Sequence, residues 1–194
     1  MGKRKIDNKG FSLIELIVAV IIIAIISGGS IMAFGSVFSN KVTVACEAIQ
    51  DGLKQARVDA LGLENEIISG TLKTTIYAKF YHKDSAIYID VCSNKTGTDS
   101  DEVVLHTRKI CDDSYSLKFY ENYDDTAAVK TIDDSFTGSI KVYFKKSTGG
   151  VSGVEYSASN IKTKTDLIKV VGPGAANTQD VILVKVTGRS YLDW

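Results

Sequence analysis

The first forty residues fall into a short polar stretch and a long apolar run. Residues 1–10 carry four basic side chains against one acidic side chain. The 25 residues from Leu16 to Asn40 carry no charge. As a helix this run would extend about 37 Å, which exceeds the roughly 30 Å of a bilayer's hydrocarbon core. The pattern predicts a transmembrane helix over residues 11–40, with its basic flank in the cytoplasm and the remaining chain outside.

The apolar run continues into an amphipathic segment without a helix breaker. Apolar residues recur there at spacings of three and four: Cys46, Ile49, Leu53, Ala56 and Ala60. This spacing is one face of a helix, and charged residues occupy the other faces. We predict a single helix from about residue 12 to 61 that ends near Gly62, with residues 41–62 as its amphipathic half.

From residue 70 the hydrophobic period changes to two, which is typical of strands. Seven segments show it: 71–81, 86–92, 102–108, 115–120, 138–145, 166–171 and 180–187. Polar and glycine-rich segments such as KSTGGVSG separate them. We predict an α+β fold, in which the long helix packs on an antiparallel β-sheet or small β-sandwich head formed by residues 63–194.

Composition narrows the class of protein without changing these elements. The chain has 194 residues, a length that suits one domain, and its 23 basic side chains balance 23 acidic ones. A balanced charge gives no support to a protein that binds nucleic acid through bulk basicity. We therefore expect no nucleic-acid partner.

The three cysteines are too few for a disulfide scaffold, but two of them lie in the predicted head. Cys92 and Cys111 flank the strand predicted over residues 102–108. Outside the cytoplasm, a bridge between them would add about 3 kcal/mol of stability and leave Cys46 unpaired. The alternative is three free thiols that pack as small hydrophobes.

Side chains that could carry catalysis are sparse. The two histidines, His82 and His106, lie in the predicted strand regions without a cysteine or acid at metal-ligand spacing. The sequence also lacks the HExxH, GxSxG and P-loop motifs. We therefore predict a protein that is not an enzyme and that uses no cofactor.

One acidic segment presents closely spaced oxygen atoms. Asp99, Asp101 and Glu102 supply the hard carboxylate ligands that Ca²⁺ requires. The EF-hand spacing is missing, however, and acidic loops are more often simply solvated. Calcium is thus a weak candidate ligand of these three residues, and no other metal site is predicted.

Glu15 is the residue that a plain membrane segment does not explain. A secretory signal peptide would account for the basic stretch, the apolar run and the small residues at positions 27–29. An uncleaved membrane anchor would account for the first two features. Neither gives a reason for an acid beside Leu13 and Ile14, since a carboxylate costs up to about 3 kcal/mol at full membrane depth. Glu15 therefore needs a partner or a function.

The segment from Lys9 to Leu16, KGFSLIEL, resembles the processing motif of type IV pilins and type II secretion pseudopilins. The resemblance implies that Gly10 is the last residue of a leader peptide over residues 1–10, which a prepilin peptidase removes. It also implies that Phe11 becomes the N-methylated terminus of the mature chain. Glu15 then corresponds to the acid through which subunits of this family assemble.

The apolar segment departs from the family at one position. Pilins commonly carry a proline about two-thirds along this segment, whereas the only proline here is Pro173. Gly28, Gly29 and Gly35 would have to supply any flexibility of the helix, since glycine weakens helices by about 1 kcal/mol relative to alanine.

The resemblance extends weakly into the head. Four helix residues form an L-x-x-A-R-x-x-A-like pattern: Leu53, Ala56, Arg57 and Ala60. The chain also ends in a predicted strand that leads into a Gly-Arg pair. These features are similar to H-type minor pseudopilins and FimT-type minor pilins.

The resemblance implies a structural subunit, and the H-type features favour a minor one. Its expected partners are other pilin or pseudopilin subunits, the prepilin peptidase, an inner-membrane assembly platform and the cytoplasmic membrane. The subunit would be held in that membrane before it enters a pilus or pseudopilus at the cell surface. Two alternatives stay open: an extracytoplasmic binding domain on an uncleaved helix, and a competence pseudopilin that takes part in DNA uptake.

Overall fold

The structure is a computed structural model, and it describes residues 13–62, 67–68, 71–72, 75–94, 101–157, 159–173 and 177–193. Residues 25–39 and the two short strands β1 (Ile67–Ile68) and β2 (Thr71–Leu72) are described by their backbone alone. The chain divides into two compact units, residues 1–37 and residues 38–194, and each is described by itself.

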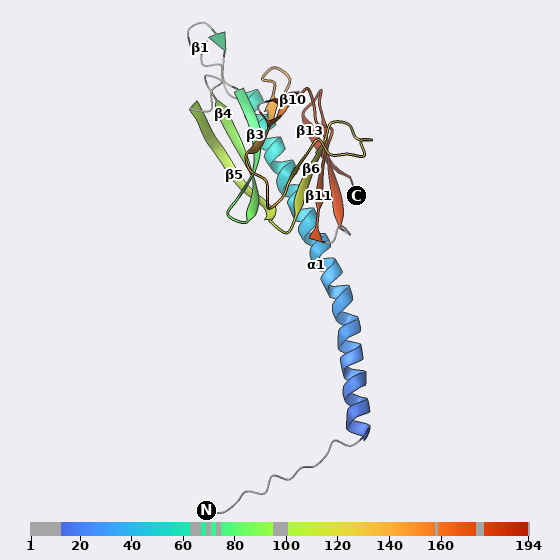
Figure 1. Cartoon of the computed structure of the whole chain (residues 1–194). Coiled ribbons are helices and arrows are strands. Elements are labelled where there is room, and N and C mark those ends of the chain that lie inside the picture. Colours follow the sequence, from blue (N-terminus) through green and yellow to red (C-terminus); the bar gives the residue numbers. More distant parts are fainter. Residues whose placement is uncertain are drawn as a thin grey trace, which may run out of the picture. The chain divides into compact units, whose positions relative to one another are not determined.

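One helix, α1, runs from Leu13 to Gly62 and has 50 residues (Figure 1). It ends at Gly62, where the hydrophobic pattern placed its end, whereas residue 12, the predicted start, lies outside the described residues. No proline interrupts the helix, and the sequence passes from apolar to amphipathic without a break. The apolar half of α1 belongs to the first unit, and residues 38–62 belong to the second.

The larger sheet of the second unit has six antiparallel strands in the order β10-β9-β8-β3-β4-β5. In chain order the strands are β3 (Thr75–Lys83), β4 (Ala86–Asn94), β5 (Glu102–Asp112), β8 (Ser139–Phe144), β9 (Val151–Ser157) and β10 (Asn160–Lys162). A two-residue turn at Asp84 and Ser85 joins β3 to β4. Both residues have positive φ, which is the backbone that suits the twist of a tight hairpin.

The second sheet has five antiparallel strands in the order β13-β12-β11-β6-β7. In chain order they are β6 (Ser116–Tyr120), β7 (Lys130–Ile132), β11 (Leu167–Val171), β12 (Thr178–Val184) and β13 (Arg189–Asp193). The predicted α+β class with antiparallel sheets is confirmed.

Both sheets and the second half of α1 contribute to one hydrophobic core. The buried face of the helix consists of Val42, Ala45, Cys46, Ile49, Leu53, Ala56 and Ala60. The two sheets meet directly where the ring of Phe80 on β3 packs edge-to-face on Phe119 of β6, with centroids 5.2 Å apart. In Figure 1 this part of α1 lies between β3–β5 on one side and β6, β11 and β13 on the other.

Every segment predicted as a strand contains one, but several strands were not predicted. The largest of these is β9, which begins within the segment KSTGGVSG that we interpreted as a connection. Its glycines favour turns locally. Pairing with β8 nevertheless holds the segment extended, since Val142 pairs with Val154 and Tyr143 with Gly153. Tertiary pairing here overrides local preference.

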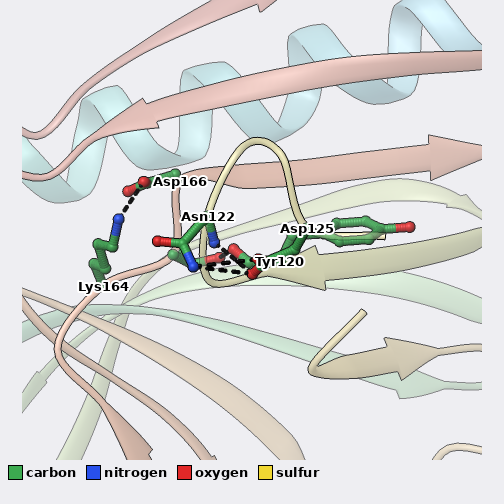
Figure 2. A network of polar contacts seen from close by, with 6 residues as sticks. Tyr120, Asn122, Asp125, Lys164 and Asp166 are labelled. Atoms are coloured by element: carbon green, nitrogen blue, oxygen red, sulfur yellow. Dashed lines mark hydrogen bonds and ion pairs between the residues drawn. The ribbon is translucent and has the colours of Figure 1, made fainter. Parts of the chain in front are cut away.

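A polar network ties the end of β6 to the start of β11 (Figure 2). The carboxylate of Asp125 accepts the backbone N–H of Asn122 at 2.9 Å and so closes the turn after β6. Lys164 and Asp166 form an ion pair at 2.5 Å just before β11. Between them, the hydroxyl of Thr165 donates to the carbonyl oxygen of Tyr120 at 2.7 Å. The contacts of Asp125 and Thr165 satisfy backbone groups that the strand ends would otherwise leave unpaired.

Candidate assembly helix and its attachment to the head

The first turn of α1 carries the acid that the sequence singled out. Glu15 lies in that turn and its side chain is exposed. A carboxylate is favoured at this end of a helix, because the backbone N–H groups there carry partial positive charge. Gly10 and Phe11, the predicted processing residues, lie outside the described residues.

A large apolar surface follows Glu15 along α1. Between Leu13 and Ala24, nine large apolar side chains are exposed, from 45% for Ile17 to 77% for Leu13. Soluble monomers rarely expose a contiguous surface of this kind. Covering it with apolar material would stabilise the chain by about 1 kcal/mol for each half-exposed side chain. This half of α1 therefore requires an apolar cover, either lipid or other helices.

Within the part of the chain that the structure describes, no helix combines the length and the hydropathy of a membrane span. Residues 11 and 12 and the side chains of residues 25–39, which make up much of the predicted span, lie outside the described residues. The transmembrane helix over residues 11–40 accordingly stays a prediction.

Polar contacts join the second half of α1 to both sheets. On one side, the carboxylate of Asp51 pairs with Arg108 on β5 at 2.7 Å. On the other, the side-chain amide of Gln50 donates to the carbonyl oxygen of Ser190 on β13 at 2.9 Å. Gly52 lets the helix approach β4, because a Cβ atom there would lie 2.5 Å from Cδ1 of Ile89. The head is thus held on both sides of α1.

Arg57 adds a further contact of the same kind. Its Nε donates to the carbonyl oxygen of Thr187, in the turn between β12 and β13, at 2.7 Å. The other three residues of the L-x-x-A-R-x-x-A-like pattern are buried in the core: Leu53, Ala56 and Ala60. The pattern thus has a physical reason, because the apolar residues face the sheets and Arg57 reaches a carbonyl group at the rim.

Comparison with known proteins bears on the N-terminal segment. The family model for the prokaryotic N-terminal methylation motif matches residues 6–31. This range contains Gly10, Phe11 and Glu15 and the exposed apolar surface between Leu13 and Ala24. The chain carries a prepilin-type methylation motif. No curated protein and no solved structure matches the chain.

The prepilin-type motif confirms the resemblance to type IV pilin and pseudopilin precursors. Members of that group are structural rather than enzymatic, and they assemble with other pilin subunits after processing by the prepilin peptidase. The matched range ends before residue 53, so the H-type features of the helix and the C-terminal strand stay a prediction.

Beyond the prepilin-type motif, one cleft of about 390 Å³ lies between α1 and strands β4 and β5. Arg108 and Asp51, which both line the cleft, pair with one another, and Nε2 of His106 in the same lining lies 3.6 Å from Asp59. The other histidine, His82, has its Nε2 buried without a hydrogen-bond partner. Among the described residues, no group of three Cys, His, Asp or Glu side chains could hold a metal ion.

Glu102, one of the three residues of the weak calcium candidate, is engaged in other contacts. Its carboxylate accepts hydrogen bonds from the hydroxyl of Tyr77 at 2.5 Å and from Lys79 at 2.6 Å. Burial by itself would raise the pKa of Glu102, but these two hydrogen bonds outweigh it and lower the pKa below its ordinary value. Asp101 lies next to it, and Asp99 lies outside the described residues. Glu102 therefore gives the calcium hypothesis no support.

Of the two alternatives left open for Cys92 and Cys111, the bridge is not present, because all three cysteines are free and buried. Cys111 on β5 pairs with Ile87 of β4, five residues from Cys92 on the same strand. Five residues of strand span about 17 Å, whereas a disulfide needs Cα atoms roughly 4.4–6.8 Å apart. Strands β4 and β5 thus hold the two cysteines apart, and the alternative of three buried thiols describes the structure.

These thiols should be inert in the folded protein. Burial raises the pKa of Cys46, Cys92 and Cys111 to about 12, so almost no reactive thiolate forms near neutral pH. We expect iodoacetamide to label none of them in the folded protein at pH 8, and to label all three after denaturation without reductant. Intact-mass measurement gives the count. A denatured protein that takes up a single label would instead indicate a disulfide.

The protonation of Asp180 on β12 should stabilise the folded head. Burial raises its pKa, Lys169 at 3.6 Å opposes the shift, and Asp193, directly opposite on β13, adds to it. A raised pKa means that the folded state binds the proton more tightly, so this stabilising contribution is lost as pH rises.

We therefore expect Asp180→Asn to raise the free energy of unfolding at pH 7 by up to about 1 kcal/mol, since like charges opposite one another on paired strands cost that much. The gain should disappear near pH 3, where aspartates are protonated. Denaturant unfolding at both pH values measures it. Asp166→Asn, which removes an acid already paired with Lys164, is the matched control and should give no gain. Equal effects of the two variants would contradict this account.

Proposed function

We propose that the chain is a structural subunit of a type IV pilus or a type II secretion pseudopilus, made as a prepilin. The observation that carries the proposal is the methylation motif over residues 6–31, which includes the exposed apolar helix surface from Leu13 to Ala24. A prepilin peptidase cuts between Gly10 and Phe11, and the new terminus at Phe11 is N-methylated. The subunit has no catalytic activity of its own.

The helix over residues 11–40 holds the precursor in the cytoplasmic membrane, with residues 1–10 in the cytoplasm and the head outside. An assembly platform in that membrane then transfers the subunit into the filament. There the apolar side chains that follow Glu15 exchange lipid for the helices of neighbouring subunits. The pattern formed by Leu53, Ala56, Arg57 and Ala60 supports a minor subunit within this class.

The mass of the mature protein tests the proposal. Protein purified from membranes of cells that contain a prepilin peptidase should lack residues 1–10 and carry one added methyl group on Phe11. Gly10→Val should leave the precursor at full length, because the resemblance implies that the peptidase accepts little besides glycine there. Gly2→Val, which changes a glycine of the same leader away from the junction, is the control and should be processed normally.

A full-length, unmethylated chain from the unmodified gene would contradict the proposal. It would favour the extracytoplasmic domain on an uncleaved anchor. A chain that is cut after the small residues at positions 27–29 would instead identify a secretory signal peptide.

A further inference from the structure

Strand β5 is a long open edge of the six-stranded sheet. It has 11 residues and, within the described part of the chain, pairs on one side only, with β4 (Figure 1). Three consecutive apolar side chains are exposed on it: Val103 at 53%, Val104 at 48% and Leu105 at 37%. Open apolar edges readily pair with another strand.

The direction of β5 relative to α1 follows from two ion pairs. Arg108 contacts Asp51, and His106 contacts Asp59, so β5 runs opposite to the second half of α1. All six strands of the sheet alternate in direction. Strand β10, at the other edge, therefore runs opposite to β5 and in the same direction as α1.

Both edge strands of the five-stranded sheet run in the same direction as β5. Gln50 contacts Ser190, and Arg57 contacts Thr187, so β13 also runs opposite to α1. With five alternating strands, β7 runs in the same direction as β13. Among the edges of the two large sheets in the described residues, β10 alone runs with α1.

Subunits that share one membrane orientation have their helices parallel when they assemble. A two-fold pairing of β5 with β5 of a second copy would place the two helices antiparallel, which this orientation forbids. An antiparallel pairing with helices parallel requires one edge that runs with α1 and one that runs against it. The edges that satisfy this condition are β10 on one copy and β5, β7 or β13 on the next.

The side chains favour β5 as the partner of β10. Ile161 at the centre of β10 is 67% exposed, although it is a large apolar residue. Residues that pair across neighbouring strands point to the same face, so each side chain can be traced to β3. Ile161 pairs with Glu155, which pairs with Lys141, which pairs with Lys79 on β3. Val104 pairs with Cys92, which pairs with Tyr77 on β3. Lys79 and Tyr77 are two residues apart, so Ile161 and Val104 lie on the same face of the sheet.

We propose that β10 of one copy pairs antiparallel with β5 of the next copy, with Ile161 against Val104, so that the six-stranded sheet continues from head to head. With Ile161 opposite Val104, antiparallel pairing places Lys162 opposite Val103 and Asn160 opposite Leu105, the residue that is extra in the pairing of β5 with β4. The contact joins different surfaces of the two copies, and such contacts propagate into filaments. The inference rests on the proposed function, and it favours a subunit that recurs in the filament over one present once.

Cysteine crosslinking in assembled protein tests the pairing. We expect the full-length double variant Val104→Cys and Ile161→Cys to form covalent dimers and longer ladders under mild oxidation, at least about tenfold more than either single variant. The matched control combines Ile161→Cys with Tyr191→Cys, because Tyr191 lies on the competing edge β13 and is exposed to the same 48% as Val104. The native cysteines are buried and add little background.

Ladders from the Tyr191 pair instead, or monomers only from the Val104 pair, would overturn the proposal. The same samples are checked for methylated Phe11, so that a failure of the strand contact is distinct from a failure of the proposed function. A charge exchange gives a second readout that needs no cysteine. Val104→Lys and Ile161→Lys should each reduce head-to-head association several-fold, and Val104→Lys combined with Ile161→Glu should restore it. An absence of restoration would count against the pairing.

Discussion

Glu15→Val should reduce the incorporation of this subunit into filaments at least about tenfold, while cleavage and membrane insertion stay normal. In the proposed mature subunit, the methylated amine of Phe11 and the carboxylate of Glu15 are opposite charges, and each is costly once helices bundle away from water. They offset one another only when a neighbouring subunit brings its terminus to Glu15. Removing one partner of a buried pair costs about 3–5 kcal/mol, because the other charge stays buried alone.

Co-purification with partner subunits at matched membrane levels measures this effect. Glu47→Val is the matched control, since it makes the same chemical change at another exposed acid of α1, in the half that carries the head. It should leave incorporation unchanged. Equal recovery of the unmodified protein and Glu15→Val would mean that Glu15 has no role in assembly and is only solvated near the membrane surface.

Gly188→Ala should lower the free energy of unfolding of the head by about 3 kcal/mol or more. Gly188 has φ +62°, a left-handed conformation that costs other residues about 1–2 kcal/mol. An added Cβ would also lie 1.9 Å from the carbonyl oxygen of Gly149, so the two turns that meet there would have to separate. Arg57 holds the same turn through Thr187 at 2.7 Å. A loss of this size lowers the melting temperature by about 10 °C in a domain of this length.

Two other glycines separate the causes. Gly138 has φ +106° and open space around its Cβ position, so Gly138→Ala adds backbone strain without a clash. Gly62 has neither a positive φ nor a neighbour within 4 Å, so Gly62→Ala should have almost no effect. Thermal unfolding should therefore rank the losses Gly62→Ala, Gly138→Ala and Gly188→Ala in increasing order. A Gly188→Ala protein as stable as Gly62→Ala would show that the two turns are not packed as described.

The elements that were predicted well have local signals. The end of α1 at Gly62 followed from an unbroken apolar and then amphipathic run, and the segments with period two each contain a strand. The methylation motif over residues 6–31 is also contiguous, which is why eight residues from Lys9 to Leu16 sufficed to indicate it. In each case, the side chains that determine the feature are neighbours in the chain.

The features that were missed or wrong depend on residues far apart in the chain. The sequence left a Cys92–Cys111 bridge open beside three free thiols, and only the pairing of β4 with β5 shows that the two residues are too far apart. The start of strand β9 was interpreted as a connection, because its glycines are typical of turns. Pairing with β8, which the local sequence does not reveal, makes the segment a strand. Arg57 was noted as part of a pattern, but its partner at Thr187 is 130 residues away.

The sequence by itself determined α1, the α+β class and the prepilin-type motif, because helix periodicity, strand alternation and a processing motif are each encoded in consecutive residues. Only the tertiary structure decided which strands are edges, how those edges run relative to α1 and which cysteines stay unpaired. The physical reason is that strand pairing and side-chain contacts join distant segments, such as Gln50 and Ser190, 140 residues apart. Local hydrophobic patterns specify that a strand has a buried face, but they do not specify its neighbour.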